Sequence, residues 1–139
     1  MALETTAENV EARVPITVLA LDGEVDASNF ASIIDEVGAL YRAGTRHLLI
    51  DLTNVRFLAS SGLVALHSAV RIMHGDAPPD PESGWEALHS LDRDTTGGVR
   101  QSEVRLCGAQ PAVERVLVRT GLTQLFEIHP DRTSAIAAF

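Results

Sequence analysis

The chain has 139 residues, a length typical of one domain, and 45% of them are hydrophobic, as in soluble globular proteins. Its 11 basic residues, all arginines, stand against 19 acidic residues, which gives a net charge of −8. The absence of lysine excludes a phosphate-loop lysine and a Schiff-base lysine, and the acidic balance argues against nucleic acid or an anionic membrane as a partner. We therefore expect the partner to be a protein or a small ligand.

Cys107 is the only cysteine, so neither an intramolecular disulfide nor a multi-cysteine zinc site can form. Its apolar surroundings predict a buried, unreactive thiol. No apolar run reaches the roughly 18 residues of a membrane span, and the acidic N-terminal stretch does not resemble a signal peptide. These features predict a cytoplasmic protein without a metal or a cofactor.

The first half of the chain alternates between strand and helix patterns. A strand is expected within residues 3–12, and the β-branched stretch 16–21 predicts a buried strand that ends in a turn at 22–24. Apolar residues at three- and four-residue steps then predict an amphipathic helix that Gly44 closes. These apolar residues are Phe30, Ile33, Ile34, Val37, Leu40 and Tyr41. The apolar run 47–52 predicts a strand in the interior of a sheet.

The second half continues the alternation. Residues 54–62 are expected to form a turn into a second helix, with Ser60 as the N-cap. The remaining predicted elements are a strand at 103–107, a helix from Pro111 to Gly121, a short strand at 125–128 and a terminal helix at 131–138. Alternating strands and helices predict an α/β architecture in which the sheet is at least partly parallel.

Residues 75–102 interrupt this rhythm with several glycines and prolines and an excess of acidic residues. We interpret them as an inserted acidic Pro/Gly-rich loop within a single domain that spans residues 1–139. Trp85, Leu88 and Leu91 fit one face of a short helix in this loop. The loop is either a flexible insertion or a surface that docks a partner.

Catalytic and metal-binding patterns are missing from the sequence. His67 and His74 lie seven residues apart, whereas two helical metal ligands need a spacing of three or four. Ser60 and Ser61 lack the Gly-x-Ser-x-Gly elbow of a hydrolase nucleophile. The sequence therefore predicts a protein that is not an enzyme.

Three sequence blocks occur in the order seen in the STAS family. They are residues 21–26 (LDGEVD), residues 49–63 (LIDLTNVRFLASSGL), and a third block that begins with VRLCG at 104–108 and extends through Val113 and Gly121 to Phe126. With these blocks the chain resembles bacterial anti-sigma factor antagonists of that family. The resemblance implies a single STAS-like α/β domain with a mixed central sheet of four to five strands and about four helices.

The resemblance also implies a switch at the serine pair. In the family the second serine, here Ser61, is phosphorylated by a partner that is both an anti-sigma factor and a serine kinase. The unmodified form binds this partner and frees a sigma factor, and a protein phosphatase restores that form. The partner-binding residues implied by the match are Asp26, Asn54, Ser60, Gly62 and Leu63.

One residue departs from the family pattern. The family usually has an aspartate before the two serines, where this chain has Ala59. This departure leaves a second hypothesis open, in which the domain is a non-phosphorylated scaffold or small-ligand sensing module in a larger signalling assembly. A detached domain of an anion transporter is a weaker third hypothesis, since the chain lacks a membrane span. The identity of the kinase and sigma factor and the formation of a homodimer also stay open.

Overall fold

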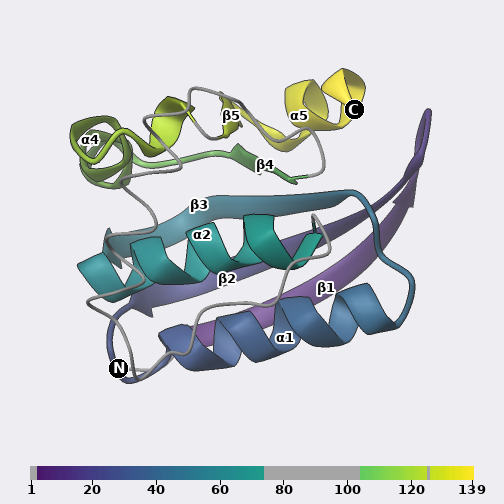
Figure 1. The fold of residues 1–139 in the computed structure, drawn as a ribbon. Helices are drawn as coiled ribbons and strands as arrows, with labels where there is room; N and C mark the ends of the chain where they lie inside the picture. The colour runs from purple at the N-terminus through teal and green to yellow at the C-terminus, as the bar shows by residue number, and fades with distance from the viewer. Residues whose placement is uncertain (1–2, 74–103, 125) are drawn as a thin grey trace.

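The computed structural model describes residues 3–73, 104–124 and 126–139, and in these ranges one five-stranded sheet is flanked by helices (Figure 1). The strands are β1 (Leu3–Glu11), β2 (Pro15–Val25), β3 (Leu48–Leu58), β4 (Val104–Cys107) and β5 (Glu127–His129). The helices are α1 (Phe30–Arg42), α2 (Ser60–Met73), α4 (Pro111–Arg119) and α5 (Arg132–Ala138), with a 3₁₀ turn η2 (Leu122–Gln124). The predicted loop 75–102, with Trp85, and His74 lie outside the described residues.

The strands follow one another across the sheet in sequence order, β1-β2-β3-β4-β5. β1 pairs antiparallel with β2 as an edge hairpin, and the pairs from β2 to β5 are all parallel. Parallel neighbours need a crossover connection, and α1 supplies it between β2 and β3. The prediction of an α/β fold with a mixed sheet is therefore confirmed.

The two faces of the sheet carry different helices. α1 and α2 lie side by side on one face, and residues of α4 join the same core (Figure 1). Side chains alternate along β3, so Leu48 and Ile50 point into this core while Leu49 points to the opposite face. There α5 packs over Leu49 and Cys107. The prediction of a buried Cys107 is confirmed, and burial raises the pKa of its thiol to about 12, which keeps the thiol protonated and unreactive.

β2 and β3 are both longer than predicted. The expected turn at residues 22–24 is wrong, because β2 continues to Val25 while β3 runs beside it to Leu58. The parallel pairing shifts register twice along this extension, and each time β3 carries one more residue than β2. The apolar pattern of the sequence ends at residue 52, so the sequence did not reveal that polar residues beyond it continue the ladder.

Two further boundaries differ from the prediction. α2 begins at Ser60, so the N-cap position belongs to Ala59, and the prediction of Ser60 as N-cap is wrong by one residue. The reason is a hydrogen bond from the Ala59 amide to the Val25 carbonyl at 2.9 Å, which holds Ala59 to the end of β2. β5 begins at Glu127 rather than at residue 125, and Phe126 is instead buried in the core.

Candidate functional site

The serine pair forms the first turn of α2, directly after the carboxyl end of β3. Ser60 is exposed and Ser61 is half-buried. The carbonyl of Ala59 accepts hydrogen bonds from the amides of Gly62 and Leu63 at 2.9 and 3.4 Å, which starts the helix. The carboxyl ends of parallel strands are where α/β sheets usually bind their ligands. The serine hydroxyls therefore stand at the end of the sheet that is best suited to a binding site.

Gly62 and Leu63 hold this turn from the inside. Leu63 is buried in the core, and Gly62 lies so close to its neighbours that a Cβ there would come within 2.4 Å of Leu58 Cδ1 and 3.0 Å of Val25 Cγ1. Only a residue without a side chain lets α2 approach the ends of β2 and β3 this closely. These two residues shape the serine turn and do not present their side chains to solvent.

Asp26 lies beside the serine turn because it follows Val25, the residue bonded to Ala59. Its carboxylate accepts hydrogen bonds from the hydroxyl and the amide of Ser28, and these bonds lower the pKa of Asp26. Its amide donates to Asn29 Oδ1 at 3.0 Å, and the Asn29 side chain donates to the Glu24 carbonyl at 2.9 Å. The turn therefore holds an ionised carboxylate one residue after the strand end that is bonded to Ala59.

Asn54 is exposed but lies apart from the serine turn. It pairs with Asp22 in the sheet, whereas the last register pair before the serines is Val25 with Leu58. Leu58 is four steps along β3 from Asn54, which is roughly 13 Å at the usual rise of a strand. The structure thus joins the backbone next to Asp26 to the residue before the serine pair, and it places Asn54 further back along β3.

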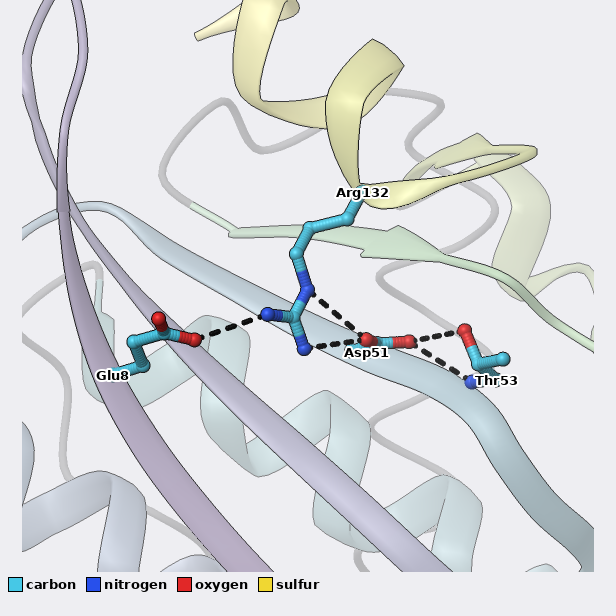
Figure 2. A network of polar contacts seen from close by, with 4 residues as sticks. All are labelled: Glu8, Asp51, Thr53 and Arg132. Atoms are coloured by element: carbon cyan, nitrogen blue, oxygen red, sulfur yellow. Dashed lines mark hydrogen bonds and ion pairs between the residues drawn. The ribbon is translucent and has the colours of Figure 1, made fainter.

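A polar network on the α5 face of the sheet anchors β3 just before Asn54 (Figure 2). Arg132 of α5 donates to Asp51 Oδ2 from Nε at 3.2 Å and from Nη2 at 2.8 Å, and its Nη1 contacts Glu8 Oε2 of β1 at 3.0 Å. The other oxygen of Asp51 accepts from the Thr53 amide at 3.0 Å and from the Thr53 hydroxyl. Three segments that are distant in sequence, β1, β3 and α5, thus meet at the guanidinium of Arg132.

The charge of Asp51 depends on these partners. Burial on its own would raise the pKa of the Asp51 carboxyl, but the hydrogen bonds from Thr53 and the ion pair with Arg132 outweigh it, and the pKa is lowered. Asp51 is therefore ionised at neutral pH, and it satisfies the amide of Thr53 at the first register shift of β3. The network stabilises the irregular part of the strand.

The loop between β4 and α4 adds a second support at the same point. Gln110 Nε2 donates to the Thr53 carbonyl at 2.8 Å. Gly108 has a φ of +72°, and a Cβ at this position would come within 2.2 Å of Thr53 Oγ1. Thr53 is thus fixed on both sides, and so is the start of the strand segment that leads to the serines.

Sequence reasoning missed the exposed aromatic residue next to the site. Phe57 is 53% exposed, although the pattern of β3 gives no reason to place a phenyl ring in solvent. Arg56 beside it lies 3.7 Å from Asp22 of β2 as an exposed ion pair. The register shifts that create this arrangement come from the pairing with β2, and a single sequence carries no signal for them.

The described residues contain no group of three or more His, Cys, Asp or Glu side chains that could hold a metal ion.

None of the helices in the described ranges has the length and apolar character needed to span a membrane. His67 is a buried residue of α2 and lies outside the serine turn.

The sequence of the chain matches a known domain family over the segment that builds this site. Residues 8–74, which include β2, β3 and the serine turn, match the STAS domain. This segment of the chain is similar in sequence to STAS domains. A search of curated proteins found no significant match.

Solved structures share the fold of this chain. An anti-sigma factor antagonist from Mycobacterium paratuberculosis superposes with a TM-score of 0.70 at 21% identity, covering 99% of this chain and 93% of that one. A candidate anti-sigma factor antagonist from Thermotoga maritima gives 0.68 at 16% identity, covering 96% and 92%. The antagonist SpoIIAA in its unphosphorylated form gives 0.55 at 16% identity, covering 96% and 94%. At these identities the similarity shows that the chain shares the fold of these proteins.

Proposed function

We propose that this STAS domain is an anti-sigma factor antagonist. It acts by binding an anti-sigma factor and not by catalysis, and phosphorylation of Ser61 controls this binding. The observation that carries the proposal is the placement of Ser61, half-buried in the first turn of α2 and linked through Ala59 to the end of β2. The similarity in fold to anti-sigma factor antagonists, one of them described as unphosphorylated, supports the same conclusion.

A phosphate on Ser61 is compatible with the folded domain. It adds roughly −1.5 to −2 charges at neutral pH, and the amides and dipole of the first turn of α2 favour a negative charge there. Ser60, which is exposed, leaves room for solvent around the added group. The modified domain therefore does not have to unfold or repack.

The binding switch needs more free energy than the helix dipole provides. The dipole contributes at most about 2 kcal/mol, whereas changing a binding equilibrium from 1:99 to 99:1 takes about 5.5 kcal/mol of differential affinity. The rest has to come from the interface, where a phosphate next to the ionised Asp26 would be an unmatched charge that loses its water on docking. The phosphate thus prevents docking and leaves the shape of the domain unchanged.

The proposed partner of the unmodified form is an anti-sigma factor that is also a serine kinase, and a protein phosphatase would restore that form. Asp26, Asn54 and Ser60 offer polar groups on the proposed docking surface, while Gly62 and Leu63 support it from the core. Sequestering the anti-sigma factor would release its sigma factor for transcription.

The test is to incubate the protein with each purified anti-sigma factor kinase of its own cell and to locate phosphate by mass spectrometry. We expect modification of the wild type and of Ser60→Ala, and none of Ser61→Ala. Ser60→Ala makes the same substitution at the neighbouring serine, so a loss of phosphorylation that is confined to Ser61→Ala identifies Ser61 as the acceptor. Phosphate on Ser60, or none with any kinase, would contradict the proposal.

A second candidate function is a small-ligand sensing or scaffold module that is never phosphorylated. It is favoured by Ala59 in place of the family's aspartate and by a cavity of about 450 Å³ at the opposite end of the sheet, lined by Thr17, Thr45, Arg46 and His47 among others. Absence of phosphorylation together with saturable ligand binding that Thr45→Val removes would favour this function over the first.

A further inference from the structure

The exposure of Phe57 results from the register with which β3 pairs with β2. Among the described residues, the large hydrophobic side chains that are exposed are Phe57, at 53%, and Val118 on α4, at 59%. Gly23 pairs with Val55 and the next residue of β2, Glu24, pairs with Phe57, so the register passes over Arg56. Val55 and Leu58 are both buried, and the additional residue turns Arg56 and Phe57 outward between them.

When another molecule covers a ring in this position, the free energy of the complex is lowered. Burying a phenyl side chain is among the largest single contributions of any residue, and aromatic anchors dominate the energetics of many interfaces. Phe57 is three residues before Ser60 in the chain, and Leu58 beside it contacts the serine turn at Gly62. The ring is therefore exposed on the strand end that leads into the site proposed for phosphorylation.

The polar groups around Phe57 are mostly acidic. Its register partner is Glu24, and Asp26 lies two residues further on, with its carboxylate ionised. The cation beside the ring, Arg56, is paired with Asp22. The immediate surroundings are thus net negative, in line with the charge of −8 of the whole chain.

We propose that Phe57 is the hydrophobic anchor of the partner interface, and that the partner presents an apolar pocket bordered by arginine or lysine side chains. The proposal rests on the function proposed above and names the chemistry of its partner. A second copy of this chain is disfavoured as the occupant, because it would bring the acidic groups around the two rings together. A cationic border satisfies the carboxylates that flank the ring.

The experiment compares two truncations of exposed side chains. Phe57→Ala and Val118→Ala both remove a side chain that is more than half exposed, so neither should change the stability of the domain appreciably. Binding of the wild type and both variants is measured against a panel of purified anti-sigma factor kinases of the same cell. With the kinase that binds the wild type, we expect Phe57→Ala to weaken affinity about 30-fold or more and Val118→Ala to change it less than about threefold.

Three results would overturn the proposal, and they are distinguishable. If the wild type and Phe57→Ala bind a kinase equally, the anchor is wrong while the proposed function stands. If no kinase of the panel binds the wild type, the proposed function fails and the anchor fails with it. If sedimentation detects a dimer of the wild type that Phe57→Ala dissociates, the ring contacts a second copy.

The charge part of the proposal has its own readout. Asp22→Asn and Glu24→Gln each remove the charge of a β2 carboxylate near Phe57 and outside the serine turn. We expect each to lower the association rate with that kinase about two- to fivefold at low salt, with the difference decreasing as salt is added. Rates that are independent of salt and of both substitutions would exclude a cationic border.

Discussion

The amide of Ala59 donates to the carbonyl of Val25 at 2.9 Å, and this one contact joins the end of β2 to the start of α2. It places Asp26 and the serine pair on the two sides of a single hydrogen bond. It also makes Ala59 the residue before the helix, at the position where other proteins have Ser, Thr, Asp or Asn to accept a bond from a first-turn amide. The chain leaves this position without a side-chain acceptor.

Ala59→Asp is therefore expected to stabilise the domain. A carboxylate at the N-cap accepts from a first-turn amide and favours the positive end of the helix dipole, so the free energy of unfolding should rise by about 0.5–2 kcal/mol. Ala43→Asp is the matched control, because Ala43 is the C-cap of α1, where a negative charge is unfavourable. Denaturant unfolding of both variants checks this, and equal effects would show that capping is not the cause.

Gly62→Ala tests the close approach of α2 to the two strands. The added methyl would lie 2.4 Å from Leu58 and 3.0 Å from Val25, both buried, so we expect a loss of about 1–3 kcal/mol. Gly38→Ala in α1 is the control, since its methyl would meet only the end of the Arg42 side chain at 3.3 Å. That variant should gain about 0.5–1 kcal/mol from helix propensity. Opposite signs in thermal unfolding are the expected outcome, and a neutral Gly62→Ala would refute the packing argument.

The sequence predicted the fold well wherever the hydrophobic pattern was regular. The helix around Ile33, Ile34 and Val37 and the strand core at 48–52 could be predicted because their residues repeat with the period of the element that buries them. β2 and β3 beyond Leu21 and Leu52 could not be predicted, because polar residues there are held by strand pairing and bulges. Pairing is a relation between two segments, and neither segment encodes it alone.

The candidate site was predictable in part for the same reason. The strand-to-helix junction before Ser60 and Ser61 follows a continuous apolar run, but a serine pair at a helix start is by itself an ordinary cap, and it was the resemblance to the STAS family that singled these serines out. The exposed Phe57 and the contact of Arg132 with Asp51 depend on segments that meet only in three dimensions. Such contacts leave no periodic trace in a single sequence.

The Asp51–Arg132 pair makes stability depend on pH in acid. The pKa of Asp51 is lowered in the folded domain, so its contribution is fully present above the unfolded value of about 3.9 and is lost as pH falls through the folded pKa. Asp51→Asn should lower the free energy of unfolding at pH 7 by about 1–3 kcal/mol. The difference from wild type should stay constant above about pH 5 and shrink below about pH 4.

Glu8→Gln is the control for the same network. It removes the second carboxylate of Arg132, which is exposed and 3.0 Å away, and leaves the contacts between Asp51, Thr53 and Arg132 in place. An exposed ion pair contributes at most about 1 kcal/mol, so the effect should be small. A difference between wild type and Asp51→Asn that stays the same down to pH 3 in denaturant titrations would contradict the assignment.

Ser61→Asp tests whether a negative charge on the serine turn reshapes the domain. A negative charge in the first turn of α2 is favoured by the helix dipole, and Ser61 is only partly buried, so an aspartate side chain there can reach solvent. We expect amide NMR shifts confined to residues 24–29 and 57–65, which include only the last two residues of β2 and of β3, with the rest of the sheet unchanged and a free energy of unfolding within about 1 kcal/mol of wild type. Ser60→Asp, one position earlier and exposed, should give shifts of similar extent. Shifts that spread from Ser61→Asp through β3 to β4 would mean that the charge acts by changing the fold, and the interface mechanism would then have to be abandoned.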